Sequence, residues 1–194
     1  MGLNQDESVI NHHWNYFLAL ESDMEQVTRY VEFNKLNYPV YSIELAHLLF
    51  AAASEFEVVA KLLCELFNQN APRENITDLR TILNNFVPEI AQENIFIPRY
   101  GLVLDTPLEY FGKGKSPKWW GKYNSVKHER NKNFKDANLE NALLALASLQ
   151  IIILYYEQEK SLTKYFNEAV KTLKPDSILL KFNALYYTEP ELIT

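Results

Sequence analysis

Residues 142–156 are apolar on nearly every side of a helix, and this run constrains the fold more than any other part of the chain. A surface helix carries a single apolar stripe, whereas a helix that is apolar all round must be buried. Two polar residues interrupt the run, which is shorter than the roughly 20 apolar residues that cross a bilayer. The pattern therefore predicts a helix at the centre of a bundle, with Asp136 or Asn138 as its cap.

Three other segments have apolar residues spaced three and four apart, which indicates amphipathic helices over residues 7–36, 42–68 and 76–86. The second segment begins with Ser42, a residue type suited to cap a helix, and is rich in alanine. Small side chains allow a neighbouring helix to approach closely, so we expect this helix to pack centrally. The fold class predicted from these patterns is mainly all-α, a bundle of four to six helices.

The region around residues 94–106 breaks the helical pattern. It is β-prone and divided by Gly101, which predicts a small β-hairpin or an extended insertion. We expect residues 1–194 to form one helical domain, with 87–118 as an irregular or β excursion within it and 161–194 as a C-terminal appendage.

Composition excludes several classes of protein. Cys64 is the single cysteine, so an intramolecular disulfide and a cysteine-rich metal site are both excluded. With only 5 glycines in 194 residues, a fold built on nucleotide-binding loops is not expected. No complete cofactor motif is present, so no cofactor or metal is expected. The first eight residues are acidic and polar, unlike a signal peptide. We expect a cytoplasmic protein that does not associate with a membrane.

Positive charge is concentrated between Lys113 and Lys135, in a chain whose net charge is −6. Eight cations and one anion, Glu129, give this stretch a charge of +7 and leave −13 for the rest of the chain. The cations are Lys113, Lys115, Lys118, Lys122, Lys127, Arg130, Lys132 and Lys135. Such a stretch attracts anions such as phosphate or nucleic acid, and a solvated basic surface without a ligand is the alternative.

Within this stretch, His128, Arg130 and Asn131 are the candidate catalytic residues. The planar guanidinium of Arg130 could clamp a phosphate, and an imidazole such as that of His128 changes protonation near neutral pH. We expect this sequence near the beginning of the central helix or on the turn before it, where backbone N–H groups also favour an anion. The candidate nucleic-acid-binding residues are Lys122, Lys127, Lys132, Trp119 and Tyr123. The two aromatic rings could stack on bases, although a Trp pair beside a buried helix is more often part of the core.

Taken together, the alanine-rich helix AAASEFEVVAKLL and the later helix introduced by Arg130-Asn131 resemble the HEPN superfamily of helical domains. The resemblance covers residues 42–160 with interruptions. It implies a protein of bacterial defence or toxin–antitoxin type that is a metal-independent ribonuclease or a noncatalytic RNA-binding module, commonly a homodimer. The family's histidine follows the arginine, whereas here Lys135, Asp136 and Ala137 occupy that window. The resemblance therefore implies either that His128 serves from upstream or that the chain is a noncatalytic relative.

Two other functions remain open from the sequence. One is a noncatalytic helical interaction module whose basic face binds an acidic protein partner. The other is a helical bundle that binds a small molecule in a pocket between its helices. For the latter the sequence offers only Glu44 and His47, which share one face of a helix.

Overall fold

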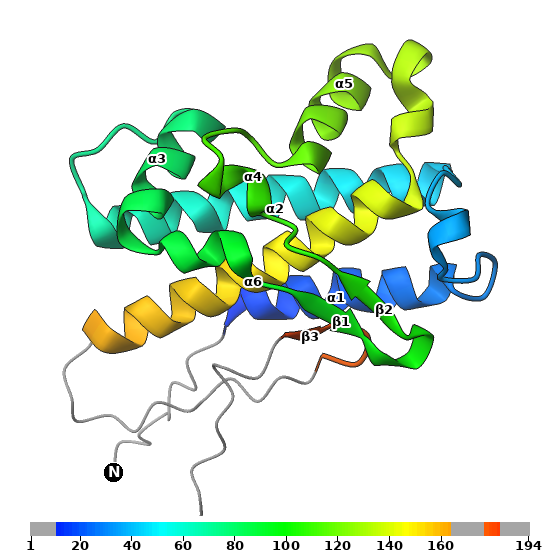
Figure 1. Ribbon diagram of the computed structural model, residues 1–194, viewed down its shortest axis with the longest axis horizontal. Helices are drawn as coiled ribbons and strands as arrows, with labels where there is room; N and C mark the ends of the chain where they lie inside the picture. Colours follow the sequence, from blue (N-terminus) through cyan, green and yellow to red (C-terminus); the bar gives the residue numbers. More distant parts are fainter. Residues whose placement is uncertain (1–10, 164–176, 183–194) are drawn as a thin grey trace, which may run out of the picture.

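The computed structural model describes residues 11–163 and 177–182, and this part of the chain is mainly helical (Figure 1). Six α-helices among the described residues surround one apolar core, and a small antiparallel sheet packs against them. The predicted mainly α-helical bundle with a β-hairpin near residues 94–106 is therefore confirmed.

Two long helices, α2 (Ile43–Phe67) and α6 (Leu139–Thr163), form the centre of the bundle. Between residues 139 and 153, α6 is buried at every position except Glu140 and Leu144. The buried small residues of α2 are Ala46, Ala52, Ala53 and Ala60. Because these side chains end at Cβ, they let the two helices pack closely, as the alanine-rich sequence predicted.

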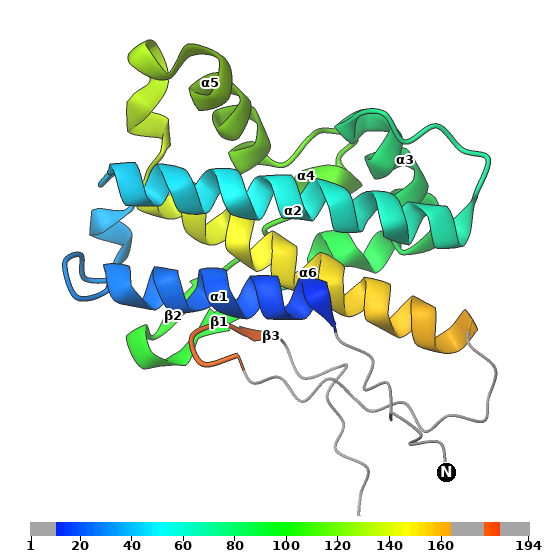
Figure 2. The same ribbon diagram turned by 180° about the vertical axis from the view of Figure 1, so that it is seen from behind.

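Both central helices begin at the same end of the molecule and run in the same general direction (Figures 1 and 2). The backbone N–H of Leu139 donates to the carbonyl of Val40 at 2.9 Å and ties the two beginnings together. The side-chain oxygen of Asn138 accepts a hydrogen bond from the N–H of Asn141 at 3.0 Å. Asn138 is therefore the cap of α6, one of the two caps that the sequence allowed.

By length and composition alone, α6 could cross a membrane over Leu139–Lys160, a longer segment than the apolar run at its centre. In its most apolar window, however, 78% of the residues are buried inside the protein. Burial of this extent is expected of a core helix, because the neighbouring elements already cover its apolar surface.

The helix α1 (His12–Val27) runs antiparallel to α2 and packs against it (Figure 2). A half-buried contact joins the two helices, with 2.6 Å between Nδ1 of His13 and Oε1 of Glu55. The buried side of α1 carries apolar residues of the predicted stripe, including Phe17 and Met24.

The prediction that the first helix continues to residue 36 is wrong, because α1 ends at Val27. The hydroxyl of Thr28 donates to the carbonyl of Glu25 at 2.6 Å, a local hydrogen bond of the kind that competes with the helical ladder. After a turn, the chain forms a separate 3₁₀ helix at Lys35–Asn37. Residues 7–10 of the predicted helix lie outside the described residues.

The sheet has the strand order β2-β1-β3, and both pairings are antiparallel. The hairpin consists of β1 (Ile95–Ile97) and β2 (Leu102–Leu104), and Gly101 between them has a φ of 58°, which glycine adopts readily. The third strand, β3 (Lys181–Phe182), comes from the far end of the chain and pairs with β1.

A buried carboxylate on α1 holds the segment that leads into β3. Oε1 of Glu21 accepts hydrogen bonds from the N–H groups of Leu179 at 3.0 Å and Leu180 at 2.8 Å, and from the hydroxyl of Ser177 at 2.6 Å. Its Oε2 accepts from the N–H of Ile178 at 3.0 Å. Residues 177–182 of the predicted appendage thus pack onto α1 and the hairpin, while 164–176 and 183–194 lie outside the described residues.

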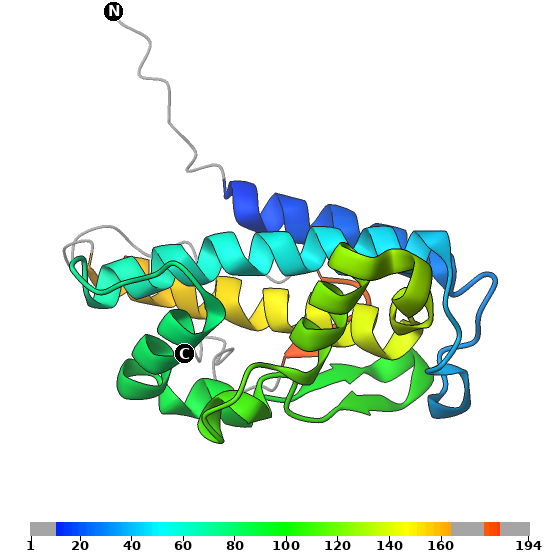
Figure 3. The ribbon, with the colours of Figure 1, turned by 90° about the horizontal axis from the view of Figure 1, so that it is seen from above.

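Three shorter helices cover one side of the central pair. They are α3 (Ile76–Phe86), α4 (Glu109–Gly112) and α5 (Lys118–Asn133). Seen from above, α5 lies over the beginnings of α2 and α6 (Figure 3). Most of the basic stretch belongs to α5, whose later turns stand away from the rest of the bundle in Figures 1 and 2.

Candidate anion-binding site on helix α5

The first half of α5 is anchored in the core by aromatic side chains. Trp119 is fully buried and Tyr123 is 6% exposed. The ring of Trp119 meets that of Phe56 edge to face at 5.3 Å, and Tyr123 meets Phe50 at 5.8 Å. The prediction that Trp119 and Tyr123 stack on nucleic-acid bases is therefore not supported, since neither ring has a face open to a base. The more ordinary role that the sequence allowed, that of core residues, fits their positions.

Beyond these anchors, α5 kinks at Glu129, whose φ of −139° and ψ of 57° are not helical. The side-chain amide of Asn133 donates to the carbonyls of Ser125 and Glu129, both at 3.2 Å, and so satisfies acceptors that the kink releases. The six residues from Lys127 to Lys132 are all exposed. We call residues 127–132 the α5 elbow.

Half of the eight cations in the basic stretch have a carboxylate within 4 Å. Lys122 lies 3.2 Å from Asp136, and Lys132 lies 2.6 Å from Glu129. The other two pairs are Lys113 with Glu109 at 2.6 Å and Lys118 with Glu140 at 3.7 Å. Three of these four carboxylates come from outside the stretch, so its field is weaker than the sequence alone indicates.

The remaining cations, Lys115, Lys127, Arg130 and Lys135, have no carboxylate within 4 Å among the described residues. Two of them belong to the α5 elbow and lie over aromatic rings. The Nζ of Lys127 is 5.3 Å from the centre of the Tyr123 ring, and the Cζ of Arg130 is 4.9 Å from that of Phe134. These rings orient the two cations without neutralising them, so both charges are available to an anion.

The three candidate catalytic residues, His128, Arg130 and Asn131, are all exposed on the α5 elbow. They do not lie at the beginning of α6, because Asn138 caps that helix and the 3₁₀ helix Phe134–Asp136 separates it from α5. Backbone donors of α6 therefore add nothing to this site, and its attraction for anions comes from side chains. Of the candidate binding residues, Lys127 and Lys132 lie on the elbow, whereas Lys122 lies earlier in α5 and is paired with Asp136.

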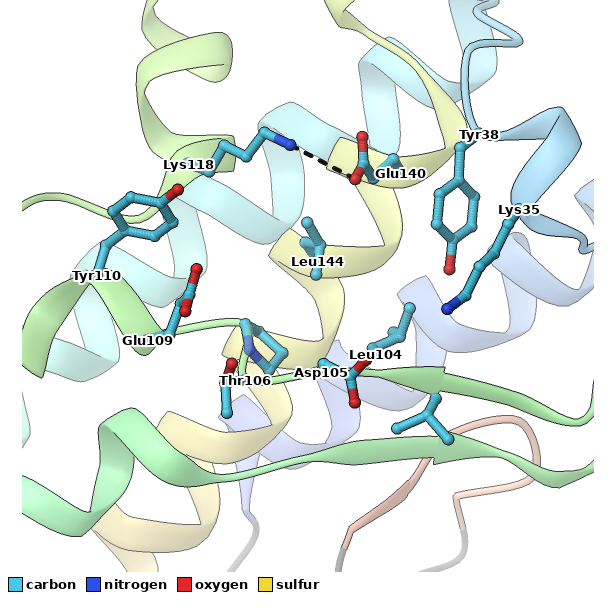
Figure 4. Close-up of a pocket in the computed structure, with 12 residues that line it drawn as sticks. Lys35, Tyr38, Leu104, Asp105, Thr106, Glu109, Tyr110, Lys118, Glu140 and Leu144 are labelled. Atoms are coloured by element: carbon cyan, nitrogen blue, oxygen red, sulfur yellow. Dashed lines mark ion pairs between the residues drawn. The ribbon is translucent and has the colours of Figure 1, made fainter.

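A second feature is a pocket of about 400 Å³ at the foot of α5, which no motif in the sequence indicated (Figure 4). Its wall includes Tyr38 after the first 3₁₀ helix, the connection from β2 to α4, the start of α5 and the first two turns of α6. Burial raises the pKa of Tyr38, and the nearby carboxylates Glu140 and Asp105 raise it further. The phenol is thus a neutral hydrogen-bond donor at physiological pH. Its neighbours come from segments far apart in the chain, so only their arrangement in space reveals the pocket.

The described residues contain no group of three or more His, Cys, Asp or Glu side chains that could hold a metal ion. Glu44 and His47, which the sequence offered for a small-molecule site, are 3.9 Å apart, and their side chains are 58% and 64% exposed. They form a solvated pair on the surface of α2 and do not line the pocket.

No protein-family model, no curated protein and no solved structure matches this chain. The resemblance to the HEPN superfamily therefore stays a prediction from the residues that carry it.

Proposed function

We propose that this protein binds RNA, or another polymer that carries phosphates, through the α5 elbow, as a HEPN-like protein of the bacterial defence or toxin–antitoxin type would. One observation carries the proposal. Lys127 and Arg130 are exposed on the part of α5 that projects from the bundle, and neither has a carboxylate within 4 Å in the described part of the chain. Phosphate contacts of this kind supply most of the sequence-independent affinity for nucleic acid.

The net charge of −6 opposes such binding only at long range. At an ionic strength of about 0.1 M, charges more than roughly 10 Å apart are largely screened, whereas contacts between a cation and a phosphate are short. The acidic remainder of the protein therefore weakens the approach of RNA at low salt more than at physiological salt. The proposed cellular location is the cytoplasm.

Binding is favoured over cleavage. General acid–base catalysis requires side chains held within hydrogen-bonding reach of the reacting atoms, and His128 and Asn131 are exposed with no side-chain hydrogen bond among the described residues. Metal-independent ribonuclease activity of His128, Arg130 and Asn131 stays a prediction, tested by RNA degradation by the wild type and by His128→Ala. The predicted homodimer is tested by sedimentation.

The binding test uses a fluorescent single-stranded RNA and measures anisotropy at several salt concentrations. The variant Lys127→Gln/Arg130→Gln removes both cations of the α5 elbow that have no carboxylate partner. The control Arg99→Gln/Lys113→Gln removes the same charge from exposed residues that are paired with Glu25 and Glu109.

We expect the elbow variant to bind more weakly and its slope of log K against log salt to shrink by about 1.4, since each lost phosphate contact accounts for about 0.7 with single strands. The control should keep the wild-type slope. No saturable binding by the wild type at low salt, or an equal loss in both variants, would refute the proposal. Preferential binding of polyglutamate over RNA would instead indicate an acidic protein partner.

A further inference from the structure

The pocket at the foot of α5 combines apolar, aromatic and charged side chains (Figure 4). Leu104, Pro107 and Leu144 supply apolar surface, and the rings of Tyr38 and Tyr110 stand on either side of it. Its volume of about 400 Å³ lies within the range of ligand pockets, about 300–1,000 Å³. Five of the twelve lining residues are charged, so the wall is more polar than that of most ligand pockets and suits a charged ligand best.

Two opposite charges at one end of the pocket have no partner. The side chains of Lys35 and Asp105 are exposed and form no ion pair or hydrogen bond within the described ranges 11–163 and 177–182; the Lys35 amine lies near the Tyr38 hydroxyl, and Asp105 lies on the other side of Leu104 (Figure 4). No ion pair joins the two side chains, so the nitrogen of Lys35 is more than 4 Å from the carboxylate oxygens of Asp105. An ammonium and a carboxylate on one wall, both open to solvent and without a partner among the described residues, suit a molecule that carries the two opposite charges.

The other charged groups of the wall are already engaged. Lys118 lies 3.7 Å from Glu140, and Glu109 lies 2.6 Å from Lys113. A ligand that enters the pocket therefore meets one available cation, that of Lys35, and one available anion, that of Asp105. The hydroxyl of Tyr38 lies near the Lys35 amine as a neutral donor.

The backbone at Asp105 is fixed by an uncommon conformation of its neighbour. Thr106 has a φ of 40°, the left-handed region that a β-branched residue rarely adopts. Its N–H donates to the side-chain oxygen of Asn94 at 2.9 Å, and this hydrogen bond secures the turn after β2. Uncommon backbone conformations of this kind gather at ligand sites, where the surrounding structure maintains them.

We propose that this pocket binds a small zwitterion, an ammonium and a carboxylate on one compact apolar or aromatic body, as in a free apolar amino acid. Its ammonium lies against the carboxylate of Asp105, and its carboxylate accepts hydrogen bonds from Lys35 and the Tyr38 hydroxyl. Its body lies between the two tyrosine rings against Leu144. The site is separate from the α5 elbow, so the proposal does not depend on RNA binding.

Isothermal titration calorimetry of the full chain tests the proposal with ligands that divide the two charges. L-Phenylalanine, L-tyrosine and L-leucine carry both charges, phenethylamine carries only the ammonium, and 3-phenylpropionate carries only the carboxylate. We expect at least one of the three amino acids to bind, and to bind about tenfold or more tightly than either singly charged compound, because each lost contact is a hydrogen bond to a charged group.

Two variants assign the charges to residues. Lys35→Gln should reduce the preference for the amino acid over phenethylamine to what the Tyr38 hydroxyl alone provides, and Asp105→Asn should abolish the preference over 3-phenylpropionate. The controls Lys61→Gln and Glu74→Gln, outside the pocket, should keep both preferences. Circular dichroism establishes that each variant is folded.

Failure of all three amino acids to bind saturably at about 10 mM would overturn the proposal, as would equal affinity for the zwitterion and both singly charged compounds. Unchanged preferences in Lys35→Gln and Asp105→Asn would also overturn it. RNA binding measured on the same samples reports separately on the α5 elbow, so failure of one proposal is distinguishable from failure of the other.

Discussion

Replacing Glu21 with alanine should release the segment 177–180 from α1. The side chain of Glu21 is only 1% exposed, and it accepts hydrogen bonds from three backbone N–H groups and the hydroxyl of Ser177. A buried N–H group that loses its acceptor costs about 1–3 kcal/mol, so the two buried ones, of Leu179 and Leu180, would together cost roughly 2–6 kcal/mol if the segment stayed in place. The alternative for the protein is to undock the segment.

Undocking limits the loss of stability. It exposes Leu179 and Leu180, which are 3% and 0% exposed, and burial of one such side chain contributes about 1.5–3 kcal/mol. We therefore expect Glu21→Ala to lower the free energy of unfolding by about 3–4 kcal/mol. Glu21→Gln keeps an oxygen for Leu179 and Leu180 but places an NH₂ group against the N–H of Ile178, so its loss should be about 1–2 kcal/mol.

Urea denaturation and hydrogen exchange measure the two parts of this effect. Peptides covering residues 177–182 should exchange fast in Glu21→Ala and slowly in the wild type. The control Glu25→Ala lies one turn further along α1, where Glu25 forms an ion pair with Arg99 at 3.2 Å on the surface, and should cost less than about 1 kcal/mol. If Glu21→Ala costs no more than Glu25→Ala, or if exchange of 177–182 is unchanged, the carboxylate does not hold this segment.

Three further predictions concern titratable groups. Burial raises the pKa of the Glu93 carboxyl group in the folded protein. The contribution of Glu93 to the free energy of unfolding is therefore fully present below the pKa of the unfolded state, and it is lost as the pH rises through the pKa of the folded state. Glu93→Gln, which can still accept from the Tyr155 hydroxyl, should therefore become more stable relative to wild type between pH 4 and pH 8 in thermal melts, and a constant difference would contradict this. Burial raises the pKa of Cys64 to about 12, so a thiol reagent at pH 8 should react only as the protein unfolds, and rapid reaction of the folded protein would refute the assignment. Asp136→Asn should release Lys122 from its ion pair and strengthen RNA binding, and weaker or unchanged binding in anisotropy would count against the proposed role of the basic stretch.

The central helices were predictable because their sequences leave few other possibilities. A segment that is apolar on every side has to be surrounded, and the alanine-rich stripe of α2 provides a surface on which it can pack closely. The hairpin was predictable for a similar local reason, since two β-prone segments flank Gly101. Where the periodicity continued past a helix end, as at Thr28, the backbone N–H groups bond to carbonyls three residues back, and this tightening at the end of α1 was not visible in the pattern.

The role of Glu21 was not predictable, because an acidic residue on an amphipathic helix normally indicates a solvated position. Its four donors lie more than 150 residues further along the chain. The pocket was not predictable for the same reason, because its unpaired charges, Lys35 and Asp105, come from segments that contain no motif.

Burial of Trp119 and Tyr123 was predictable from the sequence, since the two residues lie four positions apart on one face of α5 and share that face with Val126.

The ion pairs at the foot of α5 explain why the carboxylates of this acidic protein neutralise only some cations of the basic stretch. Lys118 and Lys122, on the first two turns of α5, pair with Glu140 of α6 and Asp136 just before it. These two pairs use the cations nearest the bundle and help attach α5 to it. Lys127 and Arg130 lie beyond the reach of those carboxylates, because α5 extends away from the bundle before it kinks at Glu129. The length of α5 thus separates cations with a structural role from cations available to a ligand, and the binding test with Lys127→Gln/Arg130→Gln addresses the second group alone.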